Sequence, residues 1–152
     1  MFEIIHYIHI AAAATFVGAV IFFDWAVGTA MLKMSPEERL KLSSSLSKPA
    51  MMVIIISLLL TVAAGITRLF MSGAIQTWSD LFTGYGLRAT LAIAVIVISE
   101  LIATPFRKKM REGLQGLDDR KFVLNYRTQA IITAVMLGLV LYLMVAMRMG
   151  LY

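Results

Sequence analysis

The residues with the clearest capacity for chemistry are two histidines near the start of the chain, His6 and His9. A spacing of three places them on neighbouring positions of one helical face. Imidazole is the commonest metal ligand in proteins and serves haem iron as an axial ligand. We therefore expect His9, the deeper of the two in the apolar sequence, to bind a haem or a copper ion, with His6 beside it. A hydrogen-bonded packing role for both histidines is the alternative.

Basic and sulfur-containing side chains are expected near these histidines. Arg68 ends one apolar run and Arg88 opens the next, so both should bind haem propionates or another anion at this depth. Because the two histidines share a helix, they cannot occupy opposite faces of a flat macrocycle. Methionine can supply the second axial ligand, from Met144 or Met147 on the last apolar run. Tyr142, a five-coordinate iron and a ligand from a second copy of the chain are the alternatives.

A second polar layer is predicted in the other half of the helices. Asp24, Glu100 and Arg127 belong to three different apolar runs, at depths that match to within about 5 Å at a rise of about 1.5 Å per residue. Charges are costly in lipid, so we predict that this arginine and the two carboxyl groups form a buried ion-pair layer that fixes the helix register. A proton path and a bound head group are the alternatives.

The composition predicts the kind of protein that must position these groups. Of its 152 residues, 60% are hydrophobic and 15% charged, and the mean hydropathy is +0.84, which indicates an integral membrane protein. Spanning the hydrocarbon core takes about 20 apolar residues. Four such runs predict an all-α four-helix bundle in a single domain, 1–152, with helices at residues 4–31, 49–71, 87–104 and 122–147. The first run lacks a basic leading segment and a small-residue cleavage site, so we expect it to be retained.

The connections between these runs differ in charge. Ser35 and Glu38 have the spacing of a capping box, which predicts a short cytoplasmic surface helix at residues 36–46. Lysines and arginines are concentrated after the first and third runs, and the connection 72–86 has none. Positive flanks stay in the cytoplasm, so both termini should be outside, in the periplasm of a bacterial cytoplasmic (inner) membrane. The net charge of +5 then reflects topology within a lipid bilayer rather than affinity for nucleic acid.

Several segments resemble two related families of small bacterial membrane proteins. They are the run from His9 to Phe22, with its small residues and Gly18, then Pro49-Ala50-Met51, Arg88 and Tyr126-Arg127. The families are the copper resistance protein D family and the haem-binding protoporphyrinogen oxidase family. The resemblance covers nearly the whole chain and implies a haem- or copper-handling membrane domain. It also implies that His9 and Arg127 correspond to functional positions of these families. Ser99 and Glu100 stand where the oxidase family has a third-helix histidine.

These observations lead to three hypotheses of function. The first is an inner-membrane redox protein that holds haem b and exchanges electrons with a quinol or a porphyrin. The second is a copper-binding or copper-transport protein that uses His6, His9 and methionines. The third is an accessory structural subunit whose polar layers serve assembly. The sequence assigns no catalytic residue, it has no cysteine for a thiolate site, and its small-residue runs at residues 11–14 and 63–65 suit either helix packing or a homodimer.

Overall fold

The structure, a computed structural model, describes residues 1–116 and 118–149, the side chain of Arg148 excepted, so the predicted domain 1–152 is described over these ranges. The described residues confirm the all-α prediction and include four helical segments that are long and apolar enough to cross a membrane. The elements in chain order are α1 (Phe2–Ile21), the π-helix η1 (Phe22–Val27), α2 (Gly28–Met31), α3 (Pro36–Met71), the 3-10 helix η2 (Trp78–Phe82), α4 (Gly84–Gln115) and α5 (Asp119–Arg148).

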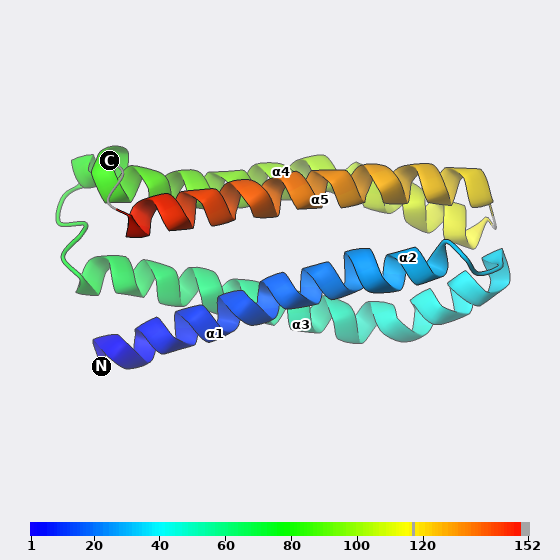
Figure 1. Ribbon diagram of the computed structural model, residues 1–152, viewed down its shortest axis with the longest axis horizontal. Helices are drawn as coiled ribbons and strands as arrows, with labels where there is room; N and C mark the ends of the chain where they lie inside the picture. Colours follow the sequence, from blue (N-terminus) through cyan, green and yellow to red (C-terminus); the bar gives the residue numbers. More distant parts are fainter. Residues whose placement is uncertain (117, 150–152) are drawn as a thin grey trace.

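Two antiparallel helical hairpins make up the bundle. The continuous segment α1–η1–α2 runs along α3 in the first hairpin, and α4 runs along α5 in the second (Figure 1). The helix α1 begins and α5 ends at one end of the bundle, which we call the terminal end (Figure 1). We call the opposite end, where α2 connects to α3 and α4 to α5, the basic end. The lysines and arginines in and beside these two connections are Lys33, Arg39, Lys41, Arg107, Lys108, Lys109, Arg111, Arg120 and Lys121.

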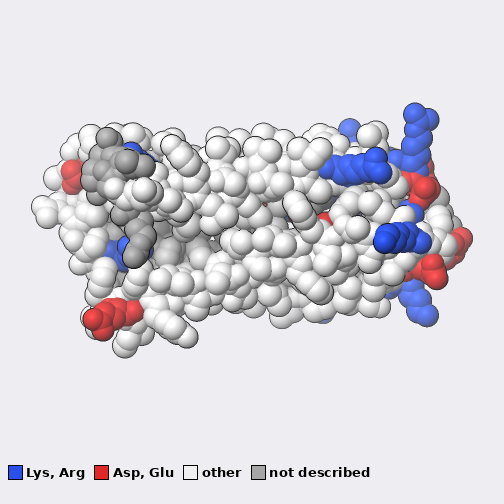
Figure 2. All heavy atoms as spheres, in the orientation of Figure 1, with Lys and Arg blue, Asp and Glu red and all other residues white. Residues whose placement is uncertain are grey.

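The surface has the polarity expected of a protein in lipid. Charged side chains gather at the two ends of the bundle, most densely at the basic end, and the middle of the visible face is mostly uncharged (Figure 2). Large apolar side chains lie on the outside of this middle zone, such as Leu101, 70% exposed, and Ile131, 65% exposed. Exposed apolar surface on this scale is stable only against lipid or another apolar partner.

Helices α3 and α4 are longer than the sequence predicts, because each continues through an internal proline, Pro49 in α3 and Pro105 in α4. The capping box is confirmed: the Ser35 backbone N–H donates to Glu38 Oε2 at 2.9 Å, and the Glu38 N–H donates to Ser35 Oγ at 3.4 Å. The predicted surface helix 36–46 and membrane helix 49–71 are, however, one helix, with Pro49 inside it. Helix α4 likewise continues past Pro105 to Gln115. Membrane helices tolerate such prolines, since neighbouring groups can satisfy the carbonyl that loses its partner.

The first span is continuous, as predicted, but contains a π-helical turn. Phe22–Val27 forms this turn, which includes Asp24, and α2 resumes at Gly28. Tyr126 of α5 packs against the turn: its hydroxyl donates to the backbone carbonyl of Asp24, and a Cβ at Gly28 would overlap its ring. Short π-helical turns are frequent at functional sites. Here the turn brings the Asp24 backbone into contact with the second hairpin.

A buried arginine adds another connection between the hairpins. Arg39, at the start of α3, is only 4% exposed and forms an ion pair with Asp119 at the start of α5. Its Nε donates to the Met31 carbonyl at 2.5 Å, and its guanidinium carbon lies 5.0 Å from the centre of the Phe122 ring. Arg39 therefore joins the end of α2 to the start of α5. In the sequence, Arg39 is only one of the basic residues that indicate the topology.

Candidate functional site

The principal candidate site is a cavity between the two hairpins, which we call the central cavity. Its volume is about 650 Å³, within the range of about 300–1,000 Å³ typical of small-molecule sites, and all four membrane-spanning segments line it. Aliphatic side chains such as Val20, Ile54 and Ile96 line its middle. Polar side chains line both ends: His9, Arg68 and Tyr85 towards the terminal end, and Asp24, Glu100, Arg107, Gln129 and Thr133 towards the basic end.

His9 is held in a defined orientation at the terminal half of the cavity. Its Nδ1 lies 2.8 Å from the backbone carbonyl oxygen of Thr61 on α3. A carbonyl can only accept, so Nδ1 carries the proton of this hydrogen bond and the neutral ring keeps a free lone pair on Nε2. Gly65, one turn further along α3, leaves room for the ring, because a Cβ there would lie 3.0 Å from His9 Cε1. Gly65, which belongs to the small-residue run 63–65, therefore allows a close contact between α3 and α1 of the same chain.

His6 does not join His9 in the cavity. It lies one turn earlier on α1, and it is not among the described residues that line the central cavity. Its ring is stacked on that of Phe2, with 6.4 Å between the ring centres, and its Nδ1 is buried without a hydrogen-bond partner in the described part of the chain. The two predicted ligands therefore have different environments, and His9 is the one that faces the cavity.

The other residues predicted for this end are divided between the cavity and a helix interface. Arg68 and Met144 line the central cavity, as does Met147. Arg88 is at the interface of α4 and α5, where its Nη1 donates to the Ala146 carbonyl at 3.2 Å. One imidazole, one guanidinium and two thioethers thus line the terminal half of the cavity.

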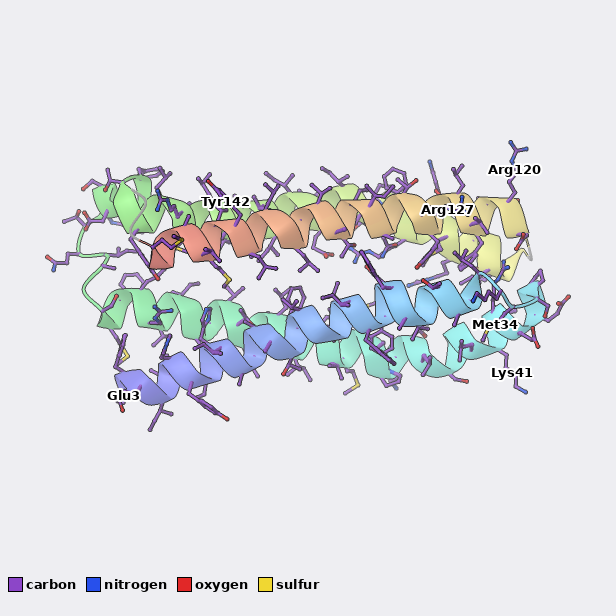
Figure 3. The ribbon with its side chains drawn as sticks, viewed as in Figure 1. Glu3, Met34, Lys41, Arg120, Arg127 and Tyr142 are labelled. Carbon is purple, nitrogen blue, oxygen red and sulfur yellow. The ribbon has the colours of Figure 1, made fainter. Side chains whose placement is uncertain are left out.

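The predicted layer of Asp24, Glu100 and Arg127 requires a correction. Arg127 is exposed on α5 (Figure 3), and the cation that pairs with Glu100 is Arg107. Arg127 precedes the buried Gln129 by two residues on α5. Two residues of α-helix correspond to a rotation of about 200°, so the two side chains point to nearly opposite sides of the helix. Arg107 is available because α4 continues beyond Pro105. Asp24, Glu100 and Arg107 all line the cavity.

Two polar residues on α5 complete the basic end of the cavity. Gln129 is 9% exposed and its Oε1 has no hydrogen-bond partner among the described residues. Thr133, one turn further on, lines the same cavity. The sequence contains a signal for this face: Asn125, Gln129 and Thr133 are four residues apart in an otherwise apolar run, so they lie along one side of the helix.

The terminal half of the cavity fits an iron porphyrin in three respects. His9 offers an unprotonated ring nitrogen, a carbonyl fixes the tautomer as it does in many metal-bound histidines, and Arg68 supplies a cation for a carboxylate. A copper ion is less well served. The described residues contain no group of three or more histidine, cysteine, aspartate or glutamate side chains that could hold a metal ion. A copper site here would rely on the thioethers of Met144 and Met147.

Comparisons with known proteins add no family to these observations. No protein-family model, no curated protein and no solved structure matches the chain.

Proposed function

We propose that this protein is a haem b-binding redox protein of the bacterial cytoplasmic membrane. The observation that carries the proposal is the hydrogen bond between His9 Nδ1 and the Thr61 carbonyl, which leaves Nε2 unprotonated beside an apolar cavity. Polarised in this way, the ring is a stronger ligand than a free imidazole. A haem bound there would supply one-electron transfer chemistry.

The remaining cavity residues have roles consistent with this proposal. Arg68 would pair with a propionate, and the thioether of Met144 would help His9 to hold the iron, with Met147 as the alternative. Arg88 would support the same end through its bond to α5 rather than bind the cofactor directly. The electron partner is proposed to be a quinol or a porphyrin, in keeping with the resemblance to the haem-binding protoporphyrinogen oxidase family. We propose that the basic end faces the cytoplasm and the termini the periplasm.

An absorption spectrum of the purified protein tests the haem proposal. We expect a Soret band, with α and β bands after reduction by dithionite. The variant His9→Ala should lose these bands, whereas the control His6→Ala, which alters the imidazole outside the cavity, should keep them. Haem content that is unchanged in His9→Ala, or a wild-type protein that binds no haem on reconstitution, would overturn the proposal.

A copper-binding or copper-transport function is the second candidate, and one observation favours it. His9 and the thioethers of Met144 and Met147 line the same half of the cavity, and thioethers are ligands that suit copper(I). A colourless preparation that binds copper(I), and loses this binding in Met144→Leu, would support this function over the first. A preparation that binds neither cofactor would support the third hypothesis, an accessory structural subunit.

A further inference from the structure

We propose that a groove between α3 and α4, near the basic end of the bundle, binds the phosphate of an anionic phospholipid, with an acyl chain of the same lipid along its apolar part. We call it the lateral groove. Its lining residues lie within 40–56 of α3 and 111–115 of α4, and its volume is about 590 Å³. The inference goes beyond the proposed function, because no proposed haem ligand lines this groove.

The α3 wall of the lateral groove changes from polar to apolar along one row of side chains. The residues in this row are Ser44, Lys48, Met52 and Ile56. Because they are four residues apart, they lie along one face of the helix. Lys48 comes directly before the apolar run 49–71, whereas Met52 and Ile56 lie inside it and are 54% and 52% exposed. A cation at the boundary of the apolar sequence, followed by open apolar surface, matches the polarity of a phospholipid.

The α4 wall supplies a second cation, Arg111, which lies one turn beyond the Arg107 that pairs with Glu100. In the described part of the chain, neither Lys48 nor Arg111 forms an ion pair. The carboxylate next to Arg111 belongs to Glu112, which pairs with Lys121 instead, with 3.1 Å between Nζ and Oε2. No aspartate or glutamate is among the described residues that line the groove. The groove therefore favours a ligand with net negative charge.

The chemistry of the two walls favours a lipid over other occupants. Basic pockets between membrane helices, at the level of the head groups, bind anionic lipids. A soluble anion would leave the exposed Met52 and Ile56 side chains without a partner. A second copy of the chain packed through the same surface would bring its own Lys48 and Arg111 against those of the first, since such an interface is self-complementary. A zwitterionic lipid carries a cation that these two residues repel.

Native mass spectrometry of the purified protein in neutral detergent micelles tests the inference. The protein is titrated with equal amounts of dioleoyl-phosphatidylglycerol and dioleoyl-phosphatidylcholine, which have the same acyl chains and differ in net charge. We expect one phosphatidylglycerol to be retained per chain, with a preference of about 25-fold, because each cation beside a phosphate contributes about fivefold. Excess glycerol phosphate, the water-soluble head group, should not displace it.

Four outcomes of this measurement would overturn the inference. They are equal retention of the two lipids, retention of neither, a dimer that carries no lipid, and displacement by glycerol phosphate. The third would show that a second copy covers the groove, and the fourth would assign the groove to a soluble anion.

Charge variants locate the phosphate. Lys48→Gln and Arg111→Gln should each lower the preference for phosphatidylglycerol about fivefold, and together they should abolish it. The control combines Lys109→Gln with Arg120→Gln, which removes two cations from the same end of the bundle. Both control residues are exposed and neither lines the groove. An equal loss in the control would show that the preference follows net charge, and the site would be refuted.

A pair of serine variants tests the groove itself without changing any charge. Ser44 and Ser45 are both exposed, and their hydroxyls donate to the Lys41 carbonyl at 2.8 and 3.1 Å, but only Ser44 lines the groove. Ser44→Trp should fill the groove and lower phosphatidylglycerol retention at least about tenfold, whereas Ser45→Trp should retain the lipid like the wild type. Circular dichroism checks that both variants keep their helices. Equal retention by the two variants would contradict the assignment.

The lipid site and the haem proposal can fail separately. His9 does not line the lateral groove, so His9→Ala should lose haem and keep its phosphatidylglycerol. A protein that binds no haem but retains the lipid would leave this inference intact and remove the proposed function.

Discussion

Arg39 offers the most direct test of how the two hairpins are held together. The proposed substitution is Arg39→Met, which keeps most of the aliphatic side chain and removes the guanidinium group. In the structure this group is buried, bonds to the Met31 carbonyl at 2.5 Å, pairs with Asp119 and lies over the Phe122 ring. The change therefore removes one bond between α3 and the end of α2 and two interactions between α3 and α5.

The expected loss of stability follows from these interactions. A hydrogen bond from a charged donor contributes about 1.5–3 kcal/mol, and a cation over an aromatic ring about 0.5–2 kcal/mol. The Asp119 side chain is 61% exposed, so its ion pair should add no more than about 1 kcal/mol. Because such terms are not additive, we expect a total loss of about 3 kcal/mol. Arg39→Lys should lose about half of this, since it keeps the charge but not the planar fork.

The measurement is unfolding by sodium dodecyl sulfate in mixed micelles, followed by tryptophan fluorescence and far-ultraviolet circular dichroism. We expect the bundle to open at lower detergent fraction while most helical signal remains, because each helix is satisfied internally in a micelle. The matched control is Arg120→Met, which removes an exposed charge from the same end of the bundle (Figure 3). If both variants open at the same detergent fraction, Arg39 does not hold the hairpins together.

Three further predictions concern close packing and the connection between the hairpins. Gly28→Ala should destabilise the bundle by about 1–3 kcal/mol in the same assay, because its new methyl group would overlap a tyrosine ring on α5. Gly18→Ala, where a Cβ meets no atom within 4 Å, should be neutral or slightly stabilising, and an equal loss would contradict the first expectation. Gly65→Ala should displace the His9 ring, because the new Cβ would lie 3.0 Å from it. This variant should therefore shift or weaken any Soret band, whereas Gly18→Ala should leave the band unchanged. The pKa of Asp80 is lowered by hydrogen bonds from backbone N–H groups, so this carboxylate should stabilise the connection at neutral pH and stop doing so as pH falls through its lowered pKa. Proteolysis of the connection should therefore rise in acid, and Asp80→Asn should remove that pH dependence.

Much of the architecture was predictable from the sequence because it depends on local and summed properties. Spanning length, apolar composition and the distribution of lysine and arginine need no knowledge of tertiary contacts. The capping box at Ser35 is local too, since both of its partners lie within one turn. The prolines misled the prediction of helix ends for the opposite reason. Whether a helix continues through Pro49 or Pro105 depends on whether neighbouring groups satisfy the carbonyl that each proline leaves without a partner. A rule based on the local sequence contains no information about those neighbours.

The candidate site was only partly predictable. The sequence singled out His9, Arg68 and Met144, and the structure brings these three to one cavity. It also singled out Arg127 on depth alone, and the rotation of α5 turns that residue outward. Depth in a membrane follows from counting residues, but direction follows from how helices pack.

The sequence by itself thus determined that the chain has four apolar spans with a basic end, and that polar residues lie at two depths. Only the tertiary structure decided that Arg39 is a buried link, that Arg107 pairs with Glu100, and that Asp24 and Gln129 line one cavity. The physical reason is that hydropathy and charge are sums over a segment, whereas a hydrogen bond or an ion pair needs two particular side chains turned towards each other. That orientation is set by the packing of helices that are distant in the sequence.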